Sequence, residues 1–128
     1  DRERAQFKLN IYVQILDDLQ AIIEYIEDNN YQIDELTTQM ELIKQTELND
    51  SNLKFSVCQA IEELWSNDII KILYETTAKD IFLSDSTKYF LDDFKRISDE
   101  DYLPNDNDML LQYRRTTGIY GKLYVMNG

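Results

Sequence analysis

Apolar residues recur every three or four positions near the start of the chain, and this spacing constrains the fold more than any other feature. It places them on one stripe of an α-helix, because a helix completes a turn about every 3.6 residues. The spacing predicts a helix from about Phe7 to Asp28, roughly 33 Å long, which Asn29 and Asn30 would end. The residues of the stripe are Ile11, Ile15, Leu19, Ile22, Ile23 and Ile26.

The rest of the chain predicts shorter helices. It holds only 3 Gly and 1 Pro, the residues that interrupt helix interiors. We therefore expect an all-α fold, with a polar loop from Ser98 to Pro104. Asn105 and Asp108 have the spacing of a variant capping box at the start of the last helix. The shorter helices are expected at about 36–47, 54–66, from 69 onward, from the Ser84-Asp85-Ser86 cap to Ile97, and at 106–113.

The helix expected at about 54–66 carries Phe55, Cys58, Ile61, Leu64 and Trp65 at spacings that predict an inner face. We interpret Cys58 on that face as a core residue rather than a nucleophile, since nothing nearby in sequence would lower the pKa of its thiol. We likewise interpret Trp65 as a core residue rather than a ligand-binding one.

The amino-acid composition changes near the end of the chain. Residues 119–125 combine β-branched and aromatic side chains and predict a short strand. A single strand cannot pair its own backbone. Its partner would come from outside this chain, as in a piece of a larger protein, or from a second copy in a strand-paired homodimer.

Composition excludes several classes of function. Lys and Arg number 13 against 25 Asp and Glu, a net charge of −12, which disfavours nucleic acid and anionic membranes as partners and leaves basic protein surfaces. The absence of His removes His-dependent nucleophiles and the commonest zinc ligand. Cys58 is the only cysteine, so no internal disulfide can form. No apolar run reaches the roughly 18 residues of a membrane span.

The segment from Tyr113 to Ile119 carries the clearest chemistry. One interpretation is an ordinary basic junction, because Gly and Thr are common there. The other is a switch segment, in which a Thr hydroxyl ligates Mg²⁺ and an Arg neutralises a phosphoryl group. A calcium loop starting at Asp106 is disfavoured, because its sixth and twelfth positions would be Leu111 and Thr117.

Several segments together resemble one family in residue type and order. They cover nearly the whole chain, and the family is the heterotrimeric G-protein α subunits, whose helical domain and part of switch I they resemble. The segments are Phe7–Tyr12 leading into Leu19–Ile23, then Ile61–Trp65, Leu83–Ile97, Tyr102–Pro104, Asp108–Leu110 and Thr116–Ile119.

The resemblance implies a six-helix domain, one long central helix surrounded by five shorter ones, inserted into a Ras-like GTPase domain. Residues 1–6 would be a linker, 7–113 the helical domain, and 114–128 the switch I-like segment with the start of a strand of the Ras-like domain. The intact protein would use GTP or GDP with Mg²⁺. Its partners would be that Ras-like domain, βγ subunits, a receptor and regulators, on the cytoplasmic side of the plasma membrane.

The resemblance also assigns individual residues. Thr116 falls at the threonine that binds Mg²⁺. Asp85 and Ser86 match positions that face the nucleotide cleft and the GTPase domain, and Leu110 matches a leucine on the nucleotide side.

One departure concerns catalysis. The family's catalytic arginine position is Tyr113 here, and a tyrosine cannot supply a guanidinium charge. Arg114, one residue later, is the candidate replacement, and Leu111 stands where the family often has an arginine near the ribose. We expect slow or atypical hydrolysis in the whole protein.

The function implied is a lid that covers bound GTP or GDP and controls its exchange and hydrolysis. The chain lacks a G-x-x-x-x-G-K-[ST] phosphate loop, so we expect it alone neither to bind nor to hydrolyse GTP appreciably. The alternative is an acidic helical module that binds a regulator or effector independently of nucleotide.

Overall fold

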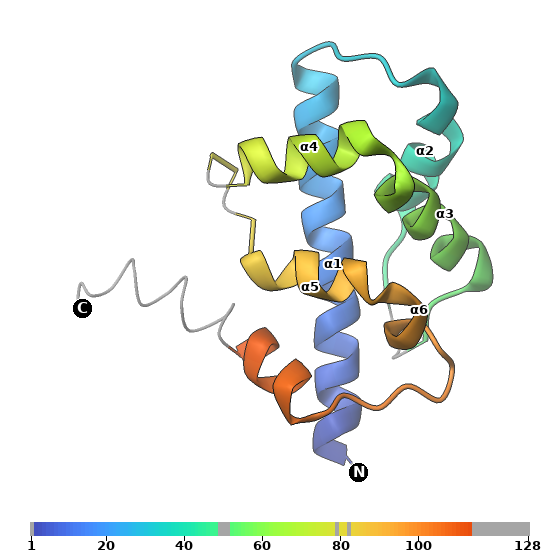
Figure 1. Cartoon of the computed structure of the whole chain (residues 1–128). Helices are drawn as coiled ribbons and strands as arrows, with labels where there is room; N and C mark the ends of the chain where they lie inside the picture. Colours follow the sequence, from blue (N-terminus) through green and yellow to red (C-terminus); the bar gives the residue numbers. More distant parts are fainter. Residues whose placement is uncertain (1, 49–51, 79, 82, 114–128) are drawn as a thin grey trace.

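The computed structural model describes residues 2–48, 52–78, 80–81 and 83–113 (Figure 1). Within these ranges the regular elements are helices and no strand occurs, which confirms the all-α prediction. The predicted strand at 119–125 lies outside the described residues. The elements are α1 (Arg2–Asp28), η1 (Asp34–Leu36), α2 (Thr37–Gln45), α3 (Phe55–Ser66), α4 (Asp68–Thr77), α5 (Asp85–Asp92), α6 (Phe94–Ile97) and an unlabelled helix at 106–113.

Helix α1 runs through the middle of the fold, and the shorter helices lie against it (Figure 1). It contacts α2, α4 and α5, and side chains such as Ile11, Ile15 and Ile22 are almost fully buried. Burial of this much apolar surface is the main stabilising term of the domain. The long central helix therefore has the place that the resemblance implied.

Helix α1 begins at Arg2, whereas the apolar spacing predicted a start near Phe7. The first residues carry no apolar stripe, so periodicity could not detect them. These residues are nevertheless helical, and Arg4 among them bonds to residues far along the chain. One of these bonds runs from Nη1 of Arg4 to the carbonyl of Pro104, at 2.5 Å. Residues 2–6 of the segment expected to be a linker are helical and continuous with α1.

The end of α1 falls where the two asparagines predicted it. Asn30 has a φ of 59°, the left-handed conformation that Asn tolerates better than most residues. The amide of Tyr31 donates to the carbonyl of Ile26 at 3.0 Å, and that of Asn30 to Glu27 at 3.1 Å. This bonding closes the last turn of the helix.

Helices α3 and α4 meet at the predicted break. The side chain of Asn67 caps α4 by accepting from the amide of Ile69 at 2.9 Å. Ile61, Leu64 and Trp65 are buried as predicted.

Phe55 was wrongly predicted to be inside and is 76% exposed. It is the first residue of α3, where Val57 and Ala60 are the buried side chains of the opening turns. Cys58 is partly buried and lies against the core.

The helix predicted to run through Ile97 is interrupted at Asp93, whose φ and ψ are −112° and 28°. The apolar spacing continues across the break, because Phe90, Phe94 and Ile97 are all buried. Asp93 instead accepts a 2.6 Å bond from Nε of Arg96. Periodicity alone could not show a kink that preserves the buried face.

Candidate functional site

The residues that the resemblance assigned to the nucleotide side lie on two neighbouring helices. Asp85 is exposed at the start of α5. Leu110 and Tyr113, 53% and 56% exposed, belong to the helix at 106–113. The start of α5 and the end of that helix lie on the same side of α1, at the left of Figure 1. Arg114 and Thr116 lie outside the described residues.

These two helices are joined through Tyr89. Its hydroxyl donates to Asp108 at 3.3 Å and accepts from the side-chain amide of Asn107 at 3.3 Å. The structure therefore joins α5 to the helix at 106–113. We give the name α5 edge to three exposed residues of these two helices, Asp85, Leu110 and Tyr113.

Ser86, in contrast, is turned inward. Ser84 caps α5 by accepting from the amide of Ser86 at 3.2 Å, as predicted for this cap. The Ser86 hydroxyl lies 2.8 Å from the Ser84 hydroxyl and accepts from Nε2 of Gln14 at 2.8 Å. Ser86 is thus buried against α1 and leaves Asp85 as the exposed polar residue of the pair.

A buried carboxylate lies below the start of α5. Asp18 accepts a 2.5 Å bond from the Thr87 hydroxyl and a 3.3 Å bond from the amide of Ser84. Gln14 donates to the same Thr87 oxygen at 2.9 Å. A buried charge needs such donors, and the N-terminal end of a helix also favours a negative group. This cluster fixes the position of α5 on α1.

Sequence reasoning missed this cluster. Its signal was present, because Gln14 and Asp18 are polar residues four positions apart that interrupt the buried surface of α1. The hydroxyl partners are far away in sequence and could not be paired with them from spacing. In the described residues Oε1 of Gln14 is buried without a hydrogen-bond partner.

A second cluster surrounds Asp108, which is fully buried. Its carboxylate accepts from Nη1 and Nη2 of Arg96 at 2.8 and 2.9 Å and from the Tyr102 hydroxyl at 2.7 Å. The amide of Asn105 donates to it at 3.2 Å, while the side chain of Asn105 accepts from the amide of Asp108 at 2.8 Å. The predicted capping box is confirmed.

Charge and burial shift the pKa values of this cluster. Burial raises the pKa of Asp108, but hydrogen bonds from Arg96 and Tyr102 outweigh burial and leave it below its ordinary value. Burial, followed by the bond to Asp108, raises the pKa of Tyr102. Hydrogen bonding to Asp108 raises the pKa of Arg96. These shifts favour ionised Asp108 and Arg96 and a protonated Tyr102, the forms that their hydrogen bonds require.

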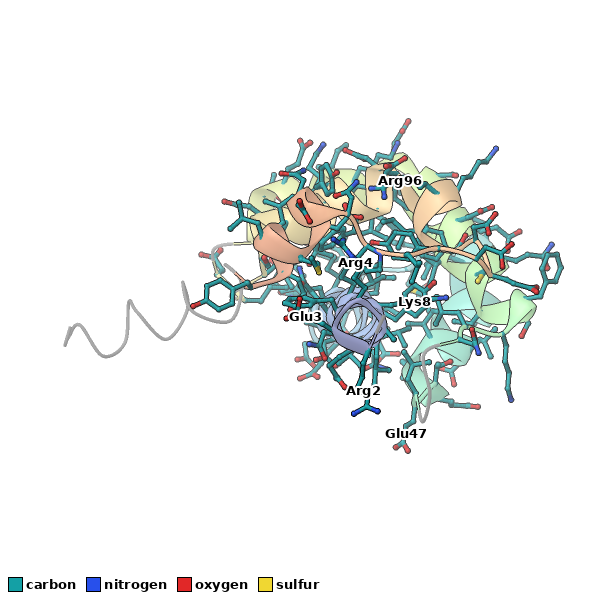
Figure 2. All side chains as sticks on the ribbon, turned by 90° about the horizontal axis from the view of Figure 1, so that it is seen from below. Arg2, Glu3, Arg4, Lys8, Glu47 and Arg96 are labelled. Carbon is teal, nitrogen blue, oxygen red and sulfur yellow. The ribbon has the colours of Figure 1, made fainter. Side chains whose placement is uncertain are left out.

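Polar contacts tie the first half of α1 to residues 97–106. Besides Pro104, Arg4 contacts Asp106 at 3.0 Å. Lys8 donates to the carbonyl of Glu100 at 3.1 Å, and the hydroxyl of Tyr12 donates to that of Ile97 at 2.6 Å. Seen from the N-terminal end of α1, Arg4 and Lys8 lie on the inner side of the helix whereas Arg2 points away (Figure 2).

Cys58 and Trp65 have the core roles expected of them. Burial, followed by the charge of Glu62, raises the pKa of the Cys58 thiol, which disfavours the nucleophilic thiolate. Trp65 is buried and donates its indole N–H to Asp92 at 2.8 Å.

The described residues do not by themselves fit a complete nucleotide or metal site. The Ser86 hydroxyl is engaged inside the domain, and the α5 edge offers one carboxylate, that of Asp85. No group of three His, Cys, Asp or Glu side chains in the described ranges could hold a metal ion. Among those residues, no helix has both the length and the apolar character needed to cross a membrane.

The described fold belongs to the all-α class of domains and is assembled around one long central helix. Comparison with known proteins then gives the family. The family model described as "G-protein alpha subunit" matches residues 1–127, and the chain belongs to this family.

Curated fungal proteins are similar to the chain. A guanine nucleotide-binding protein subunit alpha of Emericella nidulans is 28% identical over 128 residues, covering 97% of this chain and 36% of that protein. The G-protein complex alpha subunit gpaA of Aspergillus fumigatus gives the same identity and coverage. A guanine nucleotide-binding protein alpha-3 subunit of Mycosarcoma maydis is 35% identical over 69 residues, 54% of this chain and 19% of that protein. The chain thus spans about a third of the length of the full-cover relatives.

Proposed function

We propose that this chain is the helical lid of a G-protein α subunit. It would cover guanine nucleotide held by a Ras-like GTPase domain of the same protein and control exchange and hydrolysis. The observation that carries the proposal is the α5 edge, where Asp85 and Leu110, two of the three residues matched to the nucleotide side, lie exposed on adjacent helices.

The contacts of Arg4 support a hinge at one end of the domain. They join the first turns of α1 to the start of the helix at 106–113. In the proposed domain arrangement, 1–6 and the residues after 113 are the two connections to the Ras-like domain. The contacts of Arg4 would tie the first connection to the helix that leads into the second, so that the lid opens as one body.

The site roles belong to the same proposal. Asp85 and Leu110 would face the nucleotide and the Ras-like domain, while Thr116 would ligate Mg²⁺. When bound, Mg²⁺ would supply charge for phosphoryl transfer. Arg114 would stand in for the arginine that Tyr113 replaces. The whole protein would act on the cytoplasmic face of the plasma membrane with βγ subunits, a receptor and regulators.

The test adds the purified chain in trans to a matching Ras-like half loaded with a fluorescent GDP analogue. The lid proposal expects slower release of the analogue, and Asp85→Lys should weaken this effect. Glu24→Lys makes the same charge change at an exposed position of α1 and should leave the effect intact. No change in release or hydrolysis, with a folded Ras-like half and a folded chain, would overturn the proposal.

The arginine assignment has its own test in the same reconstituted system. Tyr113→Arg should raise the rate of GTP hydrolysis, because it restores a guanidinium at the family position. Arg114→Ala should lower whatever rate the unmodified chain supports. An unchanged rate in both variants would remove the catalytic role proposed for this segment.

A further inference from the structure

The backbone just before Asp85 is held by hydrogen bonds from two other helices. The amide of Ser84 donates to the buried carboxylate of Asp18 on α1 at 3.3 Å, and its carbonyl accepts from the hydroxyl of Tyr74 on α4. The Ser84 hydroxyl accepts from the amide of Ser86 at 3.2 Å. The amide, the carbonyl and the hydroxyl of Ser84 are therefore all engaged.

The two residues that follow Asp85 are held by the same part of α1. Nε2 of Gln14 donates to the hydroxyl of Ser86 at 2.8 Å and to that of Thr87 at 2.9 Å. The Thr87 hydroxyl in turn donates to Asp18 at 2.5 Å. These groups surround the start of α5, while the side chain of Asp85 is exposed. We call them the α5 frame and define it as Gln14, Asp18, Ser84, Ser86 and Thr87.

The α5 frame places polar groups in the core, where they cost stability. Gln14 and Asp18 are 0% and 3% exposed and interrupt the buried apolar surface of α1. Burying a carboxylate costs free energy even when it is hydrogen-bonded, and well-packed apolar residues often stabilise a core at least as well. Within the described residues Oε1 of Gln14 has no hydrogen-bond partner, which adds to the cost. Stability alone does not account for polar residues at these two positions, whereas fixing the backbone around Asp85 does.

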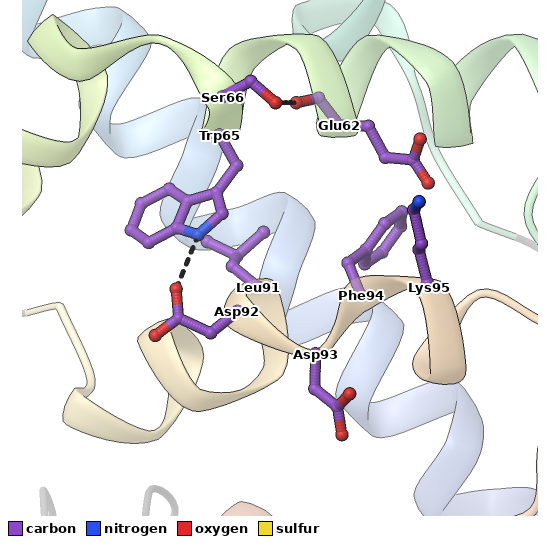
Figure 3. A pocket seen from close by; sticks show the side chains of 8 residues that line it. All are labelled: Glu62, Trp65, Ser66, Leu91, Asp92, Asp93, Phe94 and Lys95. Atoms are coloured by element: carbon purple, nitrogen blue, oxygen red, sulfur yellow. Dashed lines mark hydrogen bonds between the residues drawn. The ribbon is translucent and has the colours of Figure 1, made fainter.

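The opposite end of α5 is held in a different way. There Asp92 accepts the indole N–H of Trp65 at 2.8 Å (Figure 3) and pairs with Lys88 at 2.8 Å. The side chains of this ion pair are 49% and 45% exposed, and pairs of that kind contribute little to stability. The buried polar residues of α5, in contrast, lie in its first turn beside Asp85.

We propose that Gln14 and Asp18 are positioning residues, which fix the direction of the Asp85 side chain and thereby set how tightly the lid closes over bound nucleotide. The inference rests on the lid proposal and adds the control of Asp85 to it. Within the described ranges Asp85 forms no ion pair, so its carboxylate is available to a donor outside the domain. A hydrogen bond weakens steeply when donor and acceptor are misaligned, so a small rotation of the first turn of α5 would weaken such a contact.

The first test replaces Gln14 by methionine in the isolated chain, because methionine keeps the length of the side chain and removes both hydrogen bonds. In Gln14→Met, amide hydrogen exchange at 84–87 should accelerate about fivefold. The melting temperature should change by less than about 3 °C, because loss of the two bonds is offset by loss of the unpartnered Oε1. Gln39→Met is the matched control, since Gln39 on α2 bonds to Glu63 at 3.1 Å and also has a buried Oε1 without a partner in the described ranges. It should leave exchange at 84–87 unchanged.

The second test adds the chain in trans to the Ras-like half loaded with a fluorescent GDP analogue. Gln14→Met should raise the concentration of chain needed for half-maximal slowing of release about fivefold, and Asp18→Asn should raise it too. In an Asp85→Asn chain, Gln14→Met should change this concentration by less than about twofold, because the side chain that it positions is already altered. A purely structural role would instead give the same loss in both backgrounds.

Three control variants show whether the effect belongs to the α5 frame. Gln39→Met repeats the substitution on α2, Asp17→Asn removes an exposed carboxylate from α1, and Asp92→Asn loosens the opposite end of α5. Each should change the half-maximal concentration by less than about twofold. If a control matches Gln14→Met, the inference is overturned, because a general loss of stability or charge then explains the effect.

The remaining outcomes distinguish the inference from the lid proposal. If the unmodified chain does not slow release, the lid proposal fails and the inference fails with it. If the unmodified chain slows release and Gln14→Met slows it equally well despite faster exchange at 84–87, the inference alone is overturned. Equal losses from Gln14→Met with and without Asp85→Asn would also overturn it alone, because Gln14 would then act independently of Asp85.

Discussion

The carboxylate of Asp108 accepts hydrogen bonds from both terminal nitrogens of Arg96, at 2.8 and 2.9 Å, although the two residues are 12 positions apart and lie on either side of a loop. A planar guanidinium and a carboxylate paired in this two-point manner are among the stronger polar contacts in proteins. The pair holds residues 97–105 against the rest of the domain, and its loss should destabilise that whole segment.

Asp108→Asn should destabilise the domain by about 3 kcal/mol, because it leaves the guanidinium of Arg96 without its main partner. Urea unfolding followed by the fluorescence of Trp65 measures the change. Asp101→Asn alters an exposed carboxylate in the same loop and should stay within about 0.5 kcal/mol. Equal effects of the two substitutions would show that the pair has no special weight.

Lowering the pH should remove the stabilisation that the Arg96–Asp108 pair provides. The pKa of Asp108 is lower in the folded protein than its ordinary value of 3.8, so the unfolded chain binds more protons between the two values. The stabilisation is therefore fully present above the unfolded pKa and is lost as pH falls through the folded one. The free energy of unfolding of Asp108→Asn should depend less steeply on pH below about pH 5 than that of the unmodified chain. Parallel curves would contradict this assignment.

Arg4→Ala should loosen the helix at 106–113 without unfolding the domain. Its contacts with Pro104 and Asp106 lie near the surface, so the loss should be about 1 kcal/mol. Hydrogen exchange of the amides from Asp108 to Tyr113 should accelerate about fivefold. Arg2→Ala is the matched control, because that side chain points away from the body (Figure 2), and its exchange pattern should match the unmodified chain.

The cap of α1 predicts opposite outcomes for two substitutions at one position. Asn30→Val forces a β-branched residue into a positive φ and should cost at least about 1–2 kcal/mol. Asn30→Gly fits the same conformation and should be neutral or slightly stabilising. Thermal unfolding monitored by circular dichroism distinguishes them, and similar melting temperatures would show that the φ of 59° is not maintained.

Thr87→Val should cost about 2 kcal/mol, because it removes the hydroxyl that donates to buried Asp18 while keeping the shape of the side chain. Thr76→Val makes the same change on the exposed face of α4 and should be nearly neutral. Urea unfolding of both variants gives the comparison. A neutral Thr87→Val would mean that Asp18 is satisfied without this hydroxyl.

Local signals predicted most of the fold. The spacing of apolar residues, the asparagines after Asp28, and the caps at Ser84 and Asn105 all act within one helical turn, so sequence reveals them. The break at Asp93 was missed because the buried face continues across it. Phe55 was misplaced because the first residue of a helix can precede the packed turns.

The polar clusters were beyond local reasoning. Asp18 with Thr87, and Arg4 with Asp106, are separated by 69 and 102 positions, so only the folded chain brings them together. The candidate nucleotide-side residues came from family resemblance. The structure puts Asp85 and Leu110 at the surface and Ser86 inside, while the roles proposed for Arg114 and Thr116 stay predictions.

The uninterrupted length of α1 has a mechanical consequence. Its 27 residues make a shaft of about 40 Å, and a tilt of about 10° at the Arg2 end would carry the Asp28 end through roughly 7 Å. Because the shorter helices lie along this shaft, they would travel with it. A distance label near Asn29 should therefore register small rotations at the opposite end as large displacements.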